Sequence, residues 1–219
     1  IWGSLGVLVK QINLPSLEIA FLRAVIATLV LGFAGIHLKP KSIIKGKNLI
    51  YLLASGAAIG LNWILLFQSY KYTTIANATL SYYFAPVFVV LLSPIVLKQK
   101  LTFRKLLSVV GAMIGLFLIL NNQSNVPNIA YNHIKGISYG LGAASLYASV
   151  MLFNNYIEDL SGFERTIIQL SAASLVLLPF ILSRHELHID SYKSLIFILI
   201  IGIVHTAMAY LLYFSAFKD

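Results

Sequence analysis

Cysteine is absent from the 219 residues, and acidic side chains are scarce, with seven Asp and Glu in total. Without cysteine the chain has no disulfide framework, no thiol nucleophile and no cysteine metal ligand. Charged residues make up only 11% of the chain, against about 25% in soluble domains, while 59% of the residues are hydrophobic. A soluble fold of this length could not bury so much apolar surface, so the composition indicates a membrane protein.

The few charges leave long stretches without Asp, Glu, Lys or Arg. Six such stretches, of 23, 26, 29, 22, 18 and 24 residues, follow Lys47, Lys71, Lys105, Lys135, Arg165 and Lys193. A bilayer core about 30 Å thick needs about 20 helical residues. Each stretch therefore predicts one transmembrane helix.

Two more spans complete the predicted set. Residues 17–37 are apolar apart from Glu18 and Arg23, and the opening residues look like the tail of a helix whose beginning is missing. The predicted spans are residues 1–9, 17–37, 48–69, 75–97, 101–120, 134–156, 163–183 and 195–217. The predicted fold class is all-α, a polytopic membrane helix bundle.

Positive charge collects in two short loops, residues 39–47 and 98–105, with four Lys or Arg in each. Short loops rich in Lys and Arg stay cytoplasmic, which predicts a multi-pass protein of the cell membrane, the bacterial inner membrane, with both loops inside. The net charge of +9 is therefore explained by topology. We expect membrane lipid as a partner, and no nucleic acid.

The chain also resembles itself at an offset of about 146 residues. The matched pairs include Trp2 with Tyr147, Glu18 with Glu164 and Phe67 with Phe214. A repeat of five helices is odd, so its second copy would cross the membrane upside down, as in many transporters. The alternative is chance similarity between apolar helices. We predict a first repeat over residues 1–122 and a second over 133–219, which gives an inverted 5+5 arrangement with about eight of ten helices present.

Four stretches carry a family resemblance: IWGS at 1–4, FLRA at 21–24, FQSYKYTTIANATLSYYFAPVFVVLLSPIVLKQKLT at 67–102 and TAMAYLLYFSAFK at 206–218. In this order and spacing they resemble the EamA-type proteins of the drug/metabolite transporter superfamily. The resemblance implies a ten-helix fold with both termini cytoplasmic. It also implies export or exchange of amino acids, metabolites or drugs through a central cavity. This chain lacks the beginning of helix one and helices nine and ten of that pattern.

Strongly polar side chains near the bilayer centre are costly, so each needs a partner or a function. Asn62 and Trp63 lie in the middle of the third span, where an amide and an indole N–H could orient a solute. The alternative is an interhelical hydrogen bond for Asn62 and packing for Trp63.

Pro86 lies at the centre of the fourth span, where it leaves the Tyr82 carbonyl without its helical donor. We predict a helix kink at Pro86 beside the hydroxyls of Ser81, Tyr82 and Tyr83. Kinked helices often line transporter sites, although Pro86 could also serve packing alone.

His205 lies near the middle of the last span, and its side chain type titrates near physiological pH. It is either a proton- or substrate-binding group or a neutral core residue. Tyr147 and Tyr210 become candidates only because they match Trp2 and Trp63 in the repeat. All seven acidic residues fall in loops or at helix ends by these spans, which favours a mechanism without proton coupling.

Arg23 is expected to be structural, either reaching toward the membrane surface or pairing with Glu18. Three Gly-x-x-x-Gly pairs, at 56/60, 111/115 and 136/140, are expected to pack helices within this bundle. A homodimer remains open.

No catalytic constellation is visible. The HELHID segment at 185–190 is not the His-Glu-x-x-His motif, and no paired membrane-depth acids, nucleophile elbow or phosphate-binding loop occurs. We therefore expect no enzyme activity, no cofactor and no metal. The favoured function is alternating-access transport of a small, mostly neutral or zwitterionic solute. The alternatives are a noncatalytic membrane scaffold or a passive channel, which would need a continuous polar stripe.

Overall fold

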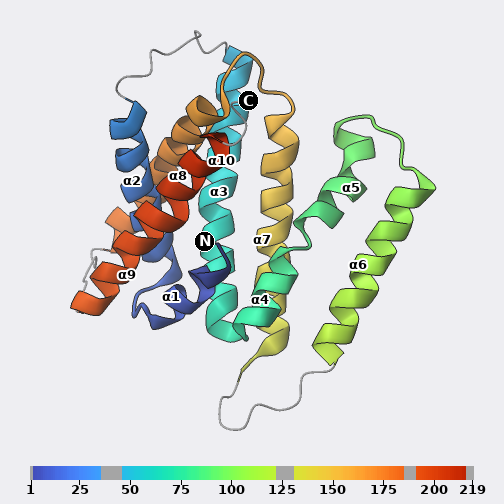
Figure 1. Cartoon of the computed structure of the whole chain (residues 1–219), viewed down its shortest axis with the longest axis horizontal. Helices are drawn as coiled ribbons and strands as arrows, with labels where there is room; N and C mark the ends of the chain where they lie inside the picture. Colours follow the sequence, from blue (N-terminus) through green and yellow to red (C-terminus); the bar gives the residue numbers. More distant parts are fainter. Residues whose placement is uncertain (1, 36–45, 122–130, 185–190, 216–219) are drawn as a thin grey trace.

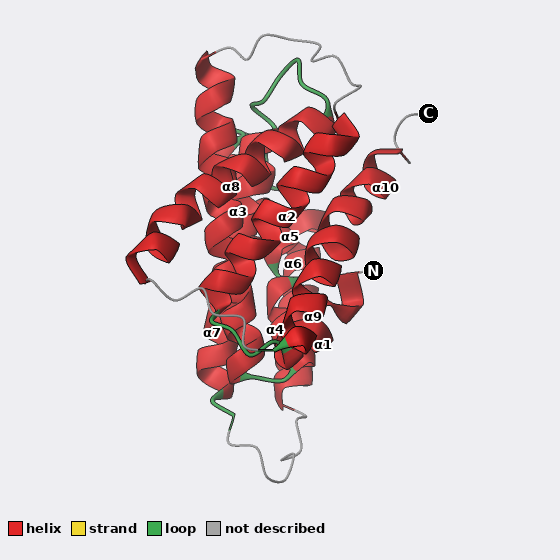
Figure 2. Ribbon diagram, turned by 90° about the vertical axis from the view of Figure 1, so that its left-hand side faces the viewer, coloured by secondary structure: helices red, strands yellow, loops and turns green. Residues whose placement is uncertain are grey.

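A computed structural model of the chain describes residues 2–35, 46–121, 131–184 and 191–215. Within these ranges every regular element is a helix and no strand occurs (Figures 1 and 2). The elements are a 3₁₀ turn (Trp2–Ser4), α1 (Leu5–Gln11), α2 (Ser16–Gly35), α3 (Gly46–Tyr72), α4 (Ile75–Tyr82), α5 (Ala85–Val96), α6 (Phe103–Asn121), α7 (His133–Asn154), α8 (Gly162–Arg184), α9 (Tyr192–Gly202), a π-helical segment (Ile203–Met208) and α10 (Ala209–Ser215).

Six helices in the described ranges are long and apolar enough to cross a membrane. They are Ser16–Gly35, Gly46–Tyr72, Ile75–Val96, His133–Asn154, Gly162–Ser183 and Tyr192–Leu212. The predicted all-α polytopic bundle is thereby confirmed. Most of the basic loop at 39–47 and the whole HELHID segment lie outside the described residues.

The fourth predicted span is broken in two rather than continuous. Residues Tyr83 and Phe84 form a turn between α4 and α5. Pro86 lies in the first turn of α5, a position where a proline's missing N–H removes no helical hydrogen bond. The interruption therefore lies just before Pro86 and changes the direction of the chain within the span (Figure 1).

The last span is irregular as well, because a six-residue π-helical segment separates α9 from α10. Thr206 Oγ1 donates to the Ile201 carbonyl at 2.9 Å, five residues earlier in the chain. π-Helical turns are rare and frequently occur at functional sites.

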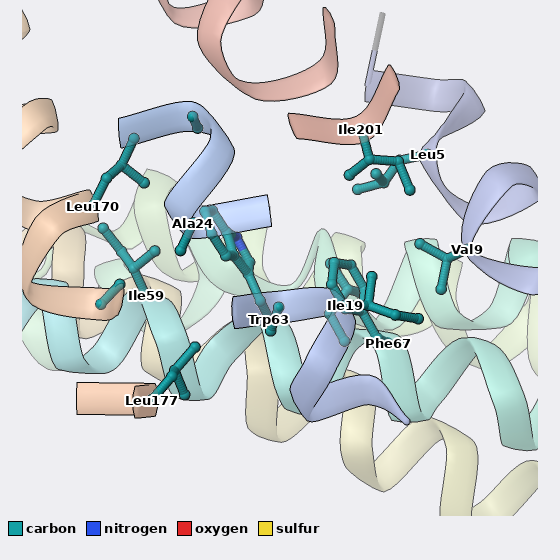
Figure 3. Packing of buried hydrophobic residues seen from close by; sticks show 14 of the residues in the cluster. Leu5, Val9, Ile19, Ala24, Ile59, Trp63, Phe67, Leu170, Leu177 and Ile201 are labelled. Atoms are coloured by element: carbon teal, nitrogen blue, oxygen red, sulfur yellow. The ribbon is translucent and has the colours of Figure 1, made fainter. Parts of the chain in front are cut away.

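The core follows one face of α3, the longest helix. Ile59, Trp63 and Phe67 recur every four residues and are almost completely buried, so they lie on the same side of the helix. They pack against α2, which contributes Ile19 and Ala24, and α8 lies beside them (Figure 3). This face places the middle of α3 at the centre of the bundle.

Two of the three glycine pairs pack helices closely together. A Cβ atom on Gly56 would lie 2.5 Å from the Ala172 Cβ of α8, and one on Gly140 would lie 2.7 Å from the Ser81 Cβ of α4. Only glycine permits these approaches. Gly111 and Gly115 meet nothing within 4 Å, because α6 contacts only α4 and α5 among the stronger helix pairs and stands apart from the others (Figure 1).

The repeat stays a prediction, with which the following helix positions can be compared. Helices α2 and α8 begin at Ser16 and Gly162, and helices α3 and α9 begin at Gly46 and Tyr192. The starts of α2 and α8 are 146 residues apart (162 − 16), whereas Gly46 is only the first described residue of α3. In addition, α3 packs on α8 while α9 packs on α2, the exchange expected if two copies of one unit face each other.

Candidate functional site

Arg23 lies inside the bundle on α2, with only 5% of its side chain exposed. Its guanidinium carbon Cζ is 4.1 Å from the centroid of the Trp63 ring on α3. Its Nε donates a hydrogen bond of 2.7 Å to Thr206 Oγ1 in the π-helical segment. One guanidinium thus joins α2, α3 and the last span.

The described contacts of the Arg23 guanidinium are with Trp63 and Thr206, whereas pairing with Glu18, one of the two roles considered for it, stays a prediction. At 3.6 residues per turn, a spacing of five residues places two side chains about 140° apart around a helix, so they leave α2 on different sides. Glu18 lies at the start of α2, buried to 5% exposure, and interacts electrostatically with Lys71 at the end of α3. The sequence did not show that Arg23 lies inside the bundle, although the angle of about 140° already separates its side chain from that of Glu18.

Three tyrosines lie within electrostatic range of the guanidinium. The hydroxyl groups of Tyr70, Tyr82 and Tyr210 are close enough to interact electrostatically with Arg23. The ring of Tyr82 also lies beside that of Tyr147 on α7, with 5.6 Å between centroids. Tyr147 and Tyr210 were selected only by repeat symmetry. In the structure both interact with Tyr82.

Asn62 approaches the same cluster from α3. Its Nδ2 donates to the Ala143 carbonyl of α7 at 2.5 Å, and its side chain also interacts with the Tyr82 hydroxyl. Asn62 Oδ1 is buried without a hydrogen-bond partner. The interhelical bond considered for Asn62 is therefore present, and it leaves one acceptor unused.

His205 lies next to Thr206 in the π-helical segment and is buried. Its Nε2 lies 2.9 Å from Ser4 Oγ, and its Nδ1 lies 3.4 Å from the Ile200 carbonyl. It also interacts electrostatically with Arg23. Asn62, Trp63, Tyr82, Tyr147, His205 and Tyr210 are linked to Arg23 directly or through Tyr82; we call these seven residues the Arg23 cluster.

Three residues selected from the sequence lie elsewhere. Ser81 is fully buried against α7 and donates to the Asn77 carbonyl at 2.7 Å. Tyr83 is 61% exposed, and Pro86 is also exposed. Neighbouring tyrosines thus have different environments: Tyr82 is partly buried beside Tyr147, whereas Tyr83 is exposed.

Polar clusters lie toward both ends of α3. At one end, Gln169 Nε2 donates to Ser55 Oγ at 2.8 Å and to Asn154 Oδ1 at 2.7 Å. At the other, Thr73 Oγ1 and His133 Nδ1 share a hydrogen bond of 2.8 Å. At 1.5 Å per residue, Trp63 lies about 12 Å from Ser55 and about 15 Å from Thr73 along the helix axis. The Arg23 cluster thus lies between these two clusters.

A separate cavity of about 470 Å³ opens at the beginning of α3 and the end of α7. It is lined by Gly46, Lys47, Asn48, Tyr51, Tyr156, Glu158 and Asp159. These residues lie at helix ends, away from the Arg23 cluster. Within the described residues, no group of three His, Asp or Glu side chains could hold a metal ion.

Helices long and apolar enough to cross a membrane thus pack around an internal cluster of aromatic and polar side chains, an arrangement that membrane transporters have. The chain belongs to the EamA-like transporter family, whose sequence model matches residues 1–121 and 134–219. The family resemblance noted in the sequence is confirmed.

The chain is similar to proteins named as uncharacterized transporters. It is 31% identical over 228 residues to the transporter YxxF of Bacillus subtilis (strain 168), covering 100% of this chain and 70% of that protein. It is 27% identical over 209 residues to a transporter of Helicobacter pylori (strain J99), covering 91% and 67%. A solved crystal structure with 18% identity and a TM-score of 0.63 covers 95% of this chain and 72% of its own, and shares the fold.

Proposed function

We propose that this transporter moves a small metabolite, amino acid or drug-like solute across the cytoplasmic membrane by alternating access, as an exporter or exchanger. The Arg23 cluster is its solute site. The observation that carries the proposal is the meeting of side chains from α2, α3, α4, α7 and the last span around one point. Those contacts join residues up to 183 positions apart.

The composition of the cluster suits a small organic solute. Aromatic rings offer large apolar faces at little conformational cost, and a few fixed polar groups orient a ligand. Trp63, Tyr82 and Tyr147 supply the faces, while Asn62 Oδ1 is an acceptor without a described partner. A fully buried amide oxygen without a partner costs free energy, so a ligand that donates to it would be stabilised.

The positions of the two polar clusters support alternating access. The Gln169 cluster joins α8 to α3 and α7, whereas the Thr73 cluster joins the turn after α3 to the start of α7. Opening the site to one side of the membrane requires only one of them to separate. The broken helix α4–α5 and the π-helical segment supply irregular backbone beside the site, as in other transporters.

The orientation completes the proposal. With the basic loops at 39–47 and 98–105 cytoplasmic, the Gln169 cluster faces the cytoplasm and the Thr73 cluster faces outward. Tyr156 donates to the Val96 carbonyl, which ties the end of α7 to the segment just before the second basic loop.

Counterflow of radiolabelled candidate solutes in proteoliposomes tests the function. We expect saturable counterflow that Tyr82→Ala reduces at least about tenfold, because one wall of the site is lost. Phe117→Ala is the matched control, since Phe117 lies 65% exposed on α6 and its loss should leave counterflow unchanged. Flux that never saturates would favour the channel. If no candidate solute either undergoes counterflow or raises the protein's melting temperature, the scaffold is favoured.

A further inference from the structure

We propose that Arg23 is the anion-binding group of the solute site and that the transported solute carries a carboxylate on a small, largely apolar body. This inference rests on the proposed function of the Arg23 cluster. It starts from the positive charge of Arg23, which has no negatively charged partner among its described contacts.

Arg23 carries a full positive charge inside a membrane-crossing helix, and each of its described contacts is neutral. The guanidinium meets the Trp63 ring at 4.1 Å, the Phe67 ring at 5.8 Å and the Thr206 hydroxyl at 2.7 Å. No carboxylate pairs with it in the part of the chain that the structure describes. Charges at membrane depth normally pair with one another or mark a substrate path.

The geometry leaves a defined part of the guanidinium available. Contact with the Trp63 ring and the hydrogen bond from Nε to Thr206 hold the group in place. Nη1 is buried and has no hydrogen-bond partner. An orphaned, charged donor that is held in place matches a carboxylate, which accepts parallel hydrogen bonds from a guanidinium edge.

Other described cations near helix ends differ from Arg23, since each donates to a protein oxygen. Lys10 Nζ donates to the Tyr131 hydroxyl at 3.0 Å, Lys135 Nζ to the Tyr72 hydroxyl at 3.1 Å, and Lys71 Nζ to the Leu14 carbonyl at 2.5 Å. Arg23 alone among these four has a buried charged donor without a partner.

The surroundings also limit the kind of anion. One guanidinium balances one negative charge, so a monoanion fits better than a phosphate dianion. The neighbouring rings of Trp63, Tyr82 and Tyr147 are apolar faces. A monocarboxylate with a hydrocarbon body would place charge against Arg23 and carbon against the rings.

Two ligands of nearly equal shape test the proposal directly. Hexanoate and hexanamide share a five-carbon tail and differ in charge. Trp63 reports their binding, because the chain has two tryptophans and a Trp2→Phe background leaves only the one that contacts Arg23. Titrations of the protein in detergent, followed by Trp63 fluorescence, should give a Kd for hexanoate at least about tenfold below that for hexanamide, or about 1.4 kcal/mol.

Three variants test whether Arg23 causes the preference for hexanoate over hexanamide. In Arg23→Gln the two Kd values should agree within about twofold, while hexanamide binds as in the parent. Lys10→Gln removes the same charge at the end of α1 and should keep the tenfold preference. Arg23→Lys keeps the charge without the planar edge and should lower the preference without abolishing it, so it serves if Arg23→Gln does not fold.

Equal binding of the two ligands by the parent overturns the inference, as does a preference that survives in Arg23→Gln. Failure of both ligands to bind also overturns it. The proposed function is judged separately, by counterflow in Tyr82→Ala against Phe117→Ala. If uncharged solutes show saturable counterflow and hexanoate binds no better than hexanamide, the carboxylate proposal fails. The proposal that the Arg23 cluster is a solute site would then still stand.

Discussion

Ser4 and His205 lie within hydrogen-bond distance, 2.9 Å from Oγ to Nε2, although 201 residues separate them in the sequence. Ser4 precedes α1 and His205 lies in the π-helical segment, so the contact joins the two ends of the described chain. In a neutral imidazole the proton would lie on Nδ1, because the Ile200 carbonyl can only accept a hydrogen bond, and Nε2 would then accept from Ser4. This arrangement fits a neutral imidazole.

That neutral state leads to a prediction about proton coupling. A second positive charge on His205 would be unfavourable near Arg23, and the buried acid Glu18 lies at the start of α2 rather than in its middle. We therefore expect exchange or facilitated diffusion without proton coupling. In proteoliposomes, a pH gradient imposed without a solute gradient should drive no uphill accumulation, in the parent and in His205→Gln alike.

The opposite results are informative in different ways. Accumulation that a protonophore abolishes would refute the uncoupled mechanism. If His205→Gln removed that accumulation while counterflow persisted, His205 would be the proton-binding group. If His205→Gln kept it, another group would carry the proton.

A second prediction concerns glycine at the α3–α8 contact. A Cβ at position 56 would lie 2.5 Å from both Ala172 Cβ and the Gln169 carbonyl oxygen, so Gly56→Ala must push the helices apart. Overpacking of this kind costs about 1–3 kcal/mol, which corresponds to a fall of about 2–12 °C in Tm for a chain of this size. Gly111→Ala should leave Tm unchanged or slightly higher, since nothing lies within 4 Å. Thermal unfolding in detergent measures both, and equal effects would show that α3 and α8 do not pack as described.

The third prediction concerns the break between α4 and α5. In Pro86→Ala the residue regains a backbone N–H, so the helix can continue through Tyr83 and Phe84 and change the direction of Tyr82. We expect altered maximal rate and half-saturating concentration in counterflow, with Tm retained, as for hinge residues in other proteins. Pro94→Ala, inside α5, is the control and should transport normally. Unaltered counterflow in Pro86→Ala would indicate that Pro86 serves packing alone.

The fourth prediction fixes the orientation, and the absence of cysteine makes it simple to measure. Gln99 and Asn132 are exposed; Gln99 lies just before α6, and Asn132 caps the start of α7, the next predicted span. A single cysteine at Gln99 should react with a membrane-impermeant maleimide only after cell lysis, whereas one at Asn132 should react in intact cells. The reverse pattern would place the basic loops outside and invert the proposed topology.

The helices were predictable from the sequence because each long stretch without charge has only one stable form in a bilayer. Pro86 indicated an interruption of the fourth span, though the turn itself lies at Tyr83 and Phe84. The π-helical segment was not predicted. It contains the polar residues His205 and Thr206, but nothing in the spacing of its residues distinguishes a five-residue hydrogen bond from a four-residue one.

The site was only partly predictable for a different reason. Composition can show that Trp63 or Tyr82 lies at membrane depth, but their meeting depends on which helices touch. Which helices touch depends on close contacts at small residues, such as Gly56 with Ala172 and Gly140 with Ser81. Several arrangements of small residues are compatible with the sequence, so neither the position of Tyr83 nor the environment of Arg23 followed from it.

The distance along the chain between Arg23 and its partners also bears on how the protein enters the membrane during synthesis. Thr206 is translated 183 residues after Arg23, an interval on the order of 10–40 s at typical elongation rates. Until then α2 holds an arginine whose insertion costs about 2.5–3.5 kcal/mol, with Trp63 of α3 as its earliest stacking partner. Integration of α2 is therefore expected to depend on the arrival of α3, and substitutions at Trp63 would lower the amount of inserted protein before any folded site exists.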